Sequence, residues 1–193
     1  MTKRLGISNK QEDNMIYFIS DMHLNHRNII RYCNRPFDSI EEMNKTLIDN
    51  WNATVTDDDI VYNLGDLTLG NPPVVTSIMK QLHGKTRLIY GNHDYWMKSK
   101  KARDYFLSID REKVLTFKYN GKELRLLLTH FPRKLEEVDA DFIIYGHIHN
   151  NEHDPYWEYQ RTHPRVLNAC VDVNDFKPVT LEQLIENNKK IKL

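Results

Sequence analysis

The stretch TRLIYGNHD, residues Thr86–Asp94, shows the pattern that decides the fold: a short apolar run ends in glycine and is followed by potential ligand-binding side chains. The same arrangement occurs in DIVYNLGD at Asp59–Asp66 and in DFIIYGHIH at Asp141–His149, and in MIYFISDMH at Met15–His23 the apolar run leads directly into Asp21 without a glycine. Short runs of branched and aromatic residues bounded by turn residues indicate buried strands. Each strand is therefore predicted to present polar side chains at its carboxyl end, where α/β proteins build their sites.

The segments between these strands predict helices in the first half of the chain. Asp38 or Ser39 can cap a helix over Asp38–Trp51, because apolar residues recur there at helical spacing. A second helix is expected to begin at Asn71-Pro72-Pro73 and to end at Gly84. A third is expected over residues 97–107.

The second half of the chain is mostly strand. Lys113–Tyr119 and Lys122–Leu128 flank the dipeptide Asn120-Gly121, which favours a tight hairpin. Arg165–Val171 predicts a further strand, and a last helix is expected to start at Thr180. A mixed sheet, or two sheets packed together and covered by helices, fits this order of elements.

Composition excludes several classes of protein. The 193 residues, 40% hydrophobic and 28% charged, fit one globular domain over residues 1–193. No apolar run reaches the ~18 residues of a membrane span, and the polar start lacks a secretory signal, so we expect a cytoplasmic protein. Zero net charge argues against strong binding to a nucleic-acid duplex. Cys33 and Cys170 are expected to be buried packing residues.

Donors of oxygen and imidazole nitrogen gather at five strand ends: Asp21, His23, Asp66, Asn92, His130, His147 and His149. In an extended chain, the side chains of residues two positions apart point the same way. Asp21 and His23 can therefore face a common point, and so can His147 and His149. Seven donors exceed one tetrahedral site but suit two adjacent cations bridged by Asp66. Mixed carboxylate and imidazole donors favour manganese, iron, zinc or nickel over calcium.

This ordered series of motifs resembles the calcineurin-like metallophosphoesterase superfamily over roughly residues 15–150. Residues 21–37, Val171-Asp172-Val173 and Lys177-Pro178-Val179 also resemble a small bacterial and phage branch of it. The resemblance implies an α+β fold, a four-layer α/β/β/α sandwich with two mixed sheets packed face to face. It assigns Asp21, His23, Asp66 and His149 to one metal, and Asp66, Asn92, His130 and His147 to the other.

The resemblance also implies a mechanism. A hydroxide that bridges the metals would attack phosphorus, His93 would protonate the leaving group as the catalytic acid, and Asp94 would be hydrogen-bonded behind His93. The expected substrate is a small phosphoester, with diesters of organic or nucleotide compounds favoured over monoesters. His26, Arg27 and Asn28 are candidate substrate contacts, as are Arg31 and Arg35, although these arginines also fit a solvated or salt-bridged helix face.

A second function remains open: a catalytically silent metal-binding scaffold of the same fold that binds another protein. Loss of one or two ligands would be its sequence signature, and none of the seven is missing. The region 150–165 matches no motif and is expected to shape specificity. Trp51, Trp96 and Trp157 are expected to be packing residues rather than platforms for bases. The sequence predicts no oligomeric state.

Overall fold

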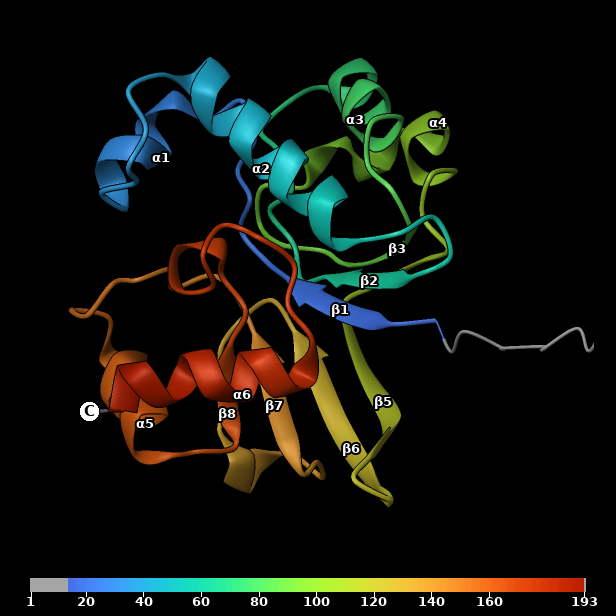
Figure 1. The fold of residues 1–193 in the computed structure, drawn as a ribbon. Helices are drawn as coiled ribbons and strands as arrows, with labels where there is room; N and C mark the ends of the chain where they lie inside the picture. The colour runs from blue at the N-terminus through green and yellow to red at the C-terminus, as the bar shows by residue number, and fades with distance from the viewer. Residues whose placement is uncertain (1–13, 193) are drawn as a thin grey trace, which may run out of the picture.

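The computed structural model describes residues 14–192 and contains two four-stranded sheets (Figure 1). The first sheet has the order β1-β2-β3-β4, and its strands are all parallel, so this sheet is not mixed as expected. The second has the order β5-β6-β7-β8, in which only β5 and β6 are antiparallel. The strands are β1 (Ile16–Ile19), β2 (Ile60–Asn63), β3 (Lys85–Ile89), β4 (Ser108–Asp110), β5 (Glu112–Tyr119), β6 (Lys122–Thr129), β7 (Phe142–Tyr145) and β8 (Val166–Asn168).

Helices lie on the outer faces of the sheets and at their ends (Figure 1). The α-helices are α1 (Arg27–Tyr32), α2 (Ile40–Thr54), α3 (Pro72–Met79), α4 (Lys100–Arg103), α5 (Pro155–Thr162) and α6 (Leu181–Lys189). Short 3₁₀ turns are η1 (Tyr95–Lys98), η2 (Leu135–Glu137), η3 (Val171–Val173) and η4 (Lys190–Lys192).

Three apolar clusters show the order of the layers. Trp51 of α2 and Val75 of α3 pack with Val61 on the outer face of the first sheet. Phe18 and Leu128 belong to the cluster between the sheets. Trp157 of α5 packs on the outer face of the second sheet in a third cluster. Alternate residues of each strand thus face opposite layers, and the four-layer α/β/β/α sandwich is confirmed.

The last helix closes one side of the sandwich. β1 and β8 are edge strands of their respective sheets, and α6 contacts both. Leu181 and Leu184 of this helix belong to the cluster between the sheets. Its first turn is stabilised by a capping box between Thr180 and Gln183, so the predicted start at Thr180 is confirmed. The helix therefore covers an otherwise open edge of the core.

Several predicted boundaries are confirmed by local chemistry. Ser39, and not Asp38, caps α2, because its side chain accepts a hydrogen bond from the Glu42 amide. Asn120 and Gly121 have φ values of 49° and 76°, as a tight hairpin with a type I′ turn requires. All three tryptophans are buried, as expected for packing residues.

Other predicted elements are wrong in extent. The helix expected over residues 97–107 is divided into η1 and α4, with Ser99 between them, and the chain then forms β4. The Leu107 amide donates to the Thr86 carbonyl of β3 at 2.8 Å, so pairing at the sheet edge begins within the predicted helix and overrides local helical preference. The helix expected to reach Gly84 ends at Met79. β8 ends at Asn168, because the chain turns into η3.

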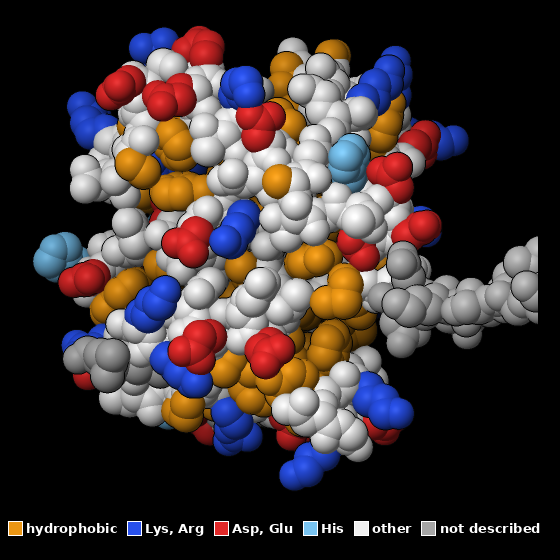
Figure 2. All heavy atoms as spheres, viewed as in Figure 1, with side chains coloured by type: hydrophobic (Ala, Val, Ile, Leu, Met, Phe, Trp, Pro, Cys, Tyr) orange, Lys and Arg blue, Asp and Glu red, His pale blue; other side chains and the backbone are white. Residues whose placement is uncertain are grey.

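Figure 2 shows the face that carries α6, where acidic and basic side chains are intermixed, as the balanced composition predicts. Apolar side chains also gather there, and a hollow of about 430 Å³ is lined by Ile16, Phe117, Tyr119 and Leu181 among others. Within residues 14–192, no helix has the length and apolar character needed to cross a membrane. The polar start on which the cytoplasmic location was predicted lies almost wholly in residues 1–13, outside the described residues.

Candidate metal centre

Two loops that follow neighbouring parallel strands run side by side and place the first carboxylates. After β1, the Asp21 amide donates to the Gly65 carbonyl at 2.9 Å, and the His23 amide donates to the Asp66 carbonyl at 2.9 Å. These bonds continue the β1–β2 pairing beyond the strands. Asp21 and Asp66 are therefore brought to the same sheet edge, both almost fully buried.

The backbone at this edge is left-handed rather than extended. Five of the seven predicted donors have positive φ: Asp21 (59°), His23 (50°), Asp66 (55°), His147 (75°) and His149 (53°). Such conformations cost about 1–3 kcal/mol each for residues other than glycine and cluster at functional sites. The expectation that each pair of donors converges through extended chain is thus wrong, since sharp turns aim the side chains instead.

Two glycines allow the loops to approach the carboxylates. A Cβ on Gly91 would lie 2.2 Å from Asp66 Oδ1. A Cβ on Gly146 would lie 2.1 Å from Ser20 Oγ and 2.4 Å from Asp21 Oδ2. Both distances are far below van der Waals contact, so any side chain at either position would displace a carboxylate. Only glycine therefore allows the backbone to approach the carboxylates this closely.

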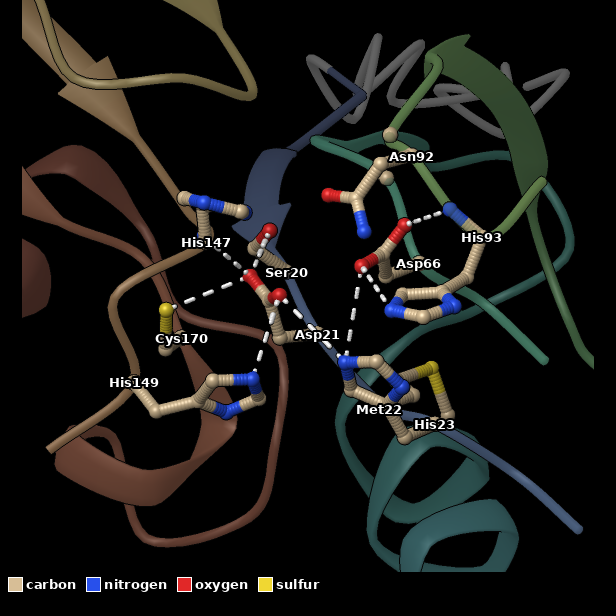
Figure 3. Close-up of polar contacts among 12 residues, drawn as sticks. Ser20, Asp21, Met22, His23, Asp66, Asn92, His93, His147, His149 and Cys170 are labelled. Atoms are coloured by element: carbon tan, nitrogen blue, oxygen red, sulfur yellow. Dashed lines mark hydrogen bonds and ion pairs between the residues drawn. The ribbon is translucent and has the colours of Figure 1, made fainter. Parts of the chain in front are cut away.

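One half of the centre is built around Asp21 (Figure 3). Its Oδ2 accepts hydrogen bonds from the Ser20 hydroxyl, the Cys170 thiol and the His147 amide. Its Oδ1 makes no hydrogen bond within the described residues and lies 3.6 Å from both His23 Nε2 and His149 Nε2. The protein therefore fixes one oxygen and leaves the other facing two imidazole nitrogens.

Asp66 occupies the middle of the centre. Its Oδ1 accepts a hydrogen bond of 2.8 Å from the His93 amide. Its Oδ2 lies 3.5 Å from His23 Nε2 and 3.6 Å from His130 Nε2. His130 is oriented by a contact of 2.7 Å between its Nδ1 and the Leu64 carbonyl. Asp66 thus faces histidines of both predicted ligand sets, the position expected of a shared ligand.

The distances between these carboxylate oxygens and imidazole nitrogens fit two ligands of one bound cation better than a direct hydrogen bond. The four nitrogen–oxygen distances of 3.5–3.6 Å exceed the hydrogen-bonding range. Ligands bound to one cation at about 2.0–2.2 Å lie about 3–3.5 Å apart. Within the described residues, both ring nitrogens of the buried His23 also lack a hydrogen-bond partner. Unsatisfied buried donors and acceptors facing a common point fit a metal site.

The pKa shifts of these residues also agree with a metal site. Burial lowers the pKa of His23 to about 4, so its imidazole is neutral and can act as a ligand. Burial and the neighbouring Asp21 charge raise the pKa of Asp66 to about 7. Burial alone would raise the pKa of Asp21, but His149 and His23 lower it well below its usual range. Divalent cations would relieve the repulsion between the two carboxylates.

The structure brings all seven predicted donors to this region. Asp21, His23 and His149 form one close group, and Asp21, Asp66 and His130 form another, with the ligand atoms of each group within 4.8 Å of one another. Asn92 Oδ1 lies 3.1 Å from His130 Nε2. The centroid of the His147 ring lies 5.2 Å from that of the His130 ring and 4.8 Å from that of the Phe131 ring, at the edge of the second group.

His93 and Asp94 have different environments. The His93 ring is about one third exposed, and its Nε2 lies 4.0 Å from Asp66 Oδ2. Asp94 is 1% exposed, and its carboxylate accepts from the amides of Asp66, Leu67 and Gly91 and from the Trp96 indole. The expected hydrogen bond between Asp94 and the His93 ring is absent from the described contacts. Asp94 instead anchors the two loops that carry Asp66 and His93.

A cavity of about 960 Å³ opens over the centre. His26 lines it, whereas the other two predicted substrate contacts, Arg27 and Asn28, are exposed in the first turn of α1 and do not. Residues 150–154 also line it and belong to the region expected to shape specificity, whereas sequence reasoning missed the rest of the wall: Ile29, Tyr32, Cys33, Asn34, Leu69 and Ile148. The Asp154-Pro155 start of α5 was an available signal, because Asp154 caps that helix and Pro155 begins it.

Comparison with known proteins agrees with this geometry. The family model of the calcineurin-like phosphoesterase superfamily domain matches residues 15–169. An uncharacterized protein of Methanocaldococcus jannaschii is 40% identical over 92% of this chain and 94% of its own. The gene 66 protein of Mycobacterium phage L5 is 27% identical over 81% of this chain and 86% of its own.

A solved structure is also similar. The crystal structure of a protein of unknown function from Aquifex aeolicus matches with a TM-score of 0.71 and 29% identity. The match covers 90% of this chain and 99% of that one. Because the family model spans both groups of donors as well as both sheets, the predicted family is confirmed: the chain belongs to the calcineurin-like phosphoesterase superfamily.

Proposed function

We propose that the protein is a binuclear metal-dependent phosphodiesterase that hydrolyses small organic or nucleotide diesters. Asp21, His23, Asp66 and His149 would hold one cation, and Asp66, Asn92, His130 and His147 would hold the other. The supporting observation is that the Asp21 and Asp66 oxygens face imidazole nitrogens at 3.5–3.6 Å beneath an open cavity. Manganese, iron, zinc and nickel all suit such donors.

When bound, two such cations would polarise the phosphate, supply a nucleophile from water at neutral pH and stabilise negative charge in the transition state. The phosphate would lie between the two predicted ligand sets, because His149 of one set and Asn92 and His147 of the other line the cavity. His93 lies on the cavity wall beside Asp66 and is exposed enough to reach a leaving oxygen. It would donate a proton to that oxygen, a role worth about 10²–10⁴-fold in rate.

The charge of the cavity supports the preference for diesters. Of the described residues, neither lysine nor arginine lines it, while Glu152 and Asp154 do. A phosphomonoester or polyphosphate carries additional negative charge that a guanidinium or ammonium group would ordinarily balance. A diester with a single negative charge needs no such group. We therefore expect kcat/KM to be higher for bis-p-nitrophenyl phosphate than for p-nitrophenyl phosphate.

The test combines metal content with turnover. Purified protein is expected to bind two divalent cations per chain and to hydrolyse bis-p-nitrophenyl phosphate with Mn²⁺, Fe²⁺, Zn²⁺ or Ni²⁺ added. Exhaustive dialysis against EDTA should abolish turnover, and adding metal back should restore it. Two tightly bound cations without turnover on any phosphoester would instead favour the scaffold function. Full turnover after removal of metal would contradict the metal-dependent mechanism.

A further inference from the structure

A buried ion pair lies directly behind one group of donors. The Arg35 Nε donates to Asp172 Oδ1 at 2.8 Å, and Nη2 donates to Asp172 Oδ2 at 3.1 Å. Both side chains are almost fully buried, although 137 positions separate them in the sequence. A planar guanidinium that meets a carboxylate through two bonds fixes the orientation of both groups.

Asp172 orients a predicted ligand. Its Oδ2 lies 2.7 Å from His149 Nδ1, so this nitrogen carries the proton and donates it. With Nδ1 engaged, His149 presents its other nitrogen, Nε2, to Asp21 Oδ1 at 3.6 Å. Carboxylates that fix a histidine tautomer in this way strengthen metal binding.

Arg35 also holds the loop that carries the other two donors. Nη2 donates to the Asp21 carbonyl and Nη1 to the Met22 carbonyl, both at 2.8 Å. These carbonyls belong to the left-handed turn in which Asp21 and His23 have positive φ. All three guanidinium nitrogens are therefore used within the protein. Arg35 is not among the cavity residues, which argues against the substrate contact considered from the sequence.

We propose that Arg35 and Asp172 are positioning residues that hold Asp21, His23 and His149 in the geometry of one metal site. The Arg35 guanidinium thereby fixes two ligand-bearing loops that follow strands of separate sheets. This inference rests on the proposed function, because it assumes that these donors bind a metal. It makes a specific claim about the other site, which Arg35 and Asp172 do not contact and which should be unaffected by their loss.

Calorimetric titration of the metal-free full chain with Mn²⁺ tests the proposal without measuring activity. Asp172→Asn and Arg35→Met are each expected to weaken one of the two Mn²⁺ sites about 10–100-fold. The affinity of the other site should stay within about twofold of the wild-type value. Arg35→Lys should recover part of the loss, because an ammonium group can still donate to some of the same acceptors.

Asp59→Asn is the matched control. Asp59 is also buried and accepts from the Met15 amide and from the amide and hydroxyl of Thr56, at the opposite end of β2. This variant should be less stable but should keep both Mn²⁺ affinities. If the Arg35→Met variant does not fold, the Mn²⁺ affinities of the folded Asp172→Asn variant test the proposal.

Four results would contradict the proposal. Wild-type affinities in folded Asp172→Asn, or an equal loss at both sites, would overturn it. So would an equal loss of affinity in Asp59→Asn. Failure of the wild-type protein to bind two Mn²⁺ would overturn the proposed function as well, so the two failures are distinguishable.

Discussion

Replacement of Gly146 by alanine tests whether the precise placement of Asp21 matters for function. The added Cβ would lie 2.1 Å from Ser20 Oγ and 2.4 Å from Asp21 Oδ2, so these groups must move by about 1 Å to reach ordinary contact. The glycine itself cannot retreat easily, because its amide donates to the His130 carbonyl at 3.1 Å. Ser20 cannot rotate away without losing its hydrogen bonds to Asp21 and to the Leu64 carbonyl.

The expected effects on stability and activity differ in size. Overpacking of a buried site costs about 1–3 kcal/mol, which corresponds to a fall in Tm of about 2–12 °C for a chain of this length. A displacement of about 1 Å in a catalytic group lowers turnover about 10²-fold. Thermal unfolding and hydrolysis of bis-p-nitrophenyl phosphate, together with Mn²⁺ affinity, measure the two effects separately.

Gly121→Ala provides the control. Gly121 has a φ of 76°, so alanine there is also strained, but the new Cβ would meet nothing within 4 Å. We expect a comparable loss of about 1–2 kcal/mol with turnover and metal affinity unchanged. A folded Gly146→Ala protein with wild-type turnover and wild-type metal affinity would refute the reasoning, because the Asp21 carboxylate would then tolerate displacement.

Three further predictions concern the metal centre. Asp66→Ala should abolish activity and lower metal content from two ions to at most one, because both groups of donors use this residue; retention of two ions would exclude a shared ligand. His93→Ala should slow turnover about 10²–10⁴-fold while both ions stay bound, whereas loss of an ion would make His93 a ligand. Metal binding should release protons. Burial lowers the pKa of His149, but Asp21 and Asp172 raise it to about 11, so a metal at its Nε2 must displace a proton at neutral pH. Mn²⁺ affinity should therefore rise about tenfold per pH unit for each proton released, and a titration with no difference between about pH 6 and about pH 8 would contradict this.

Much of the fold could be predicted because it depends on local patterns. Ile16–Ile19 and Phe142–Tyr145, for example, form the buried strands that their continuous apolar runs indicate. The element that failed, residues 97–107, is amphipathic over too few residues to form a helix without support from packing. The amide of its final residue, Leu107, donates to the Thr86 carbonyl of β3, so pairing at the sheet edge, which is not encoded locally, determines its conformation.

The types of donor side chain at the site could also be predicted from the sequence, because carboxylates and imidazoles follow the strands whose ends meet at one edge. Tertiary structure alone decided how those donors are aimed. The positive φ values at Asp21 and His149, and the contact of Arg35 with Asp172, arise from segments that meet only in the folded chain. Left-handed turns of this kind are unfavourable by themselves, and they persist because long-range hydrogen bonds and close packing against Gly91 and Gly146 stabilise them.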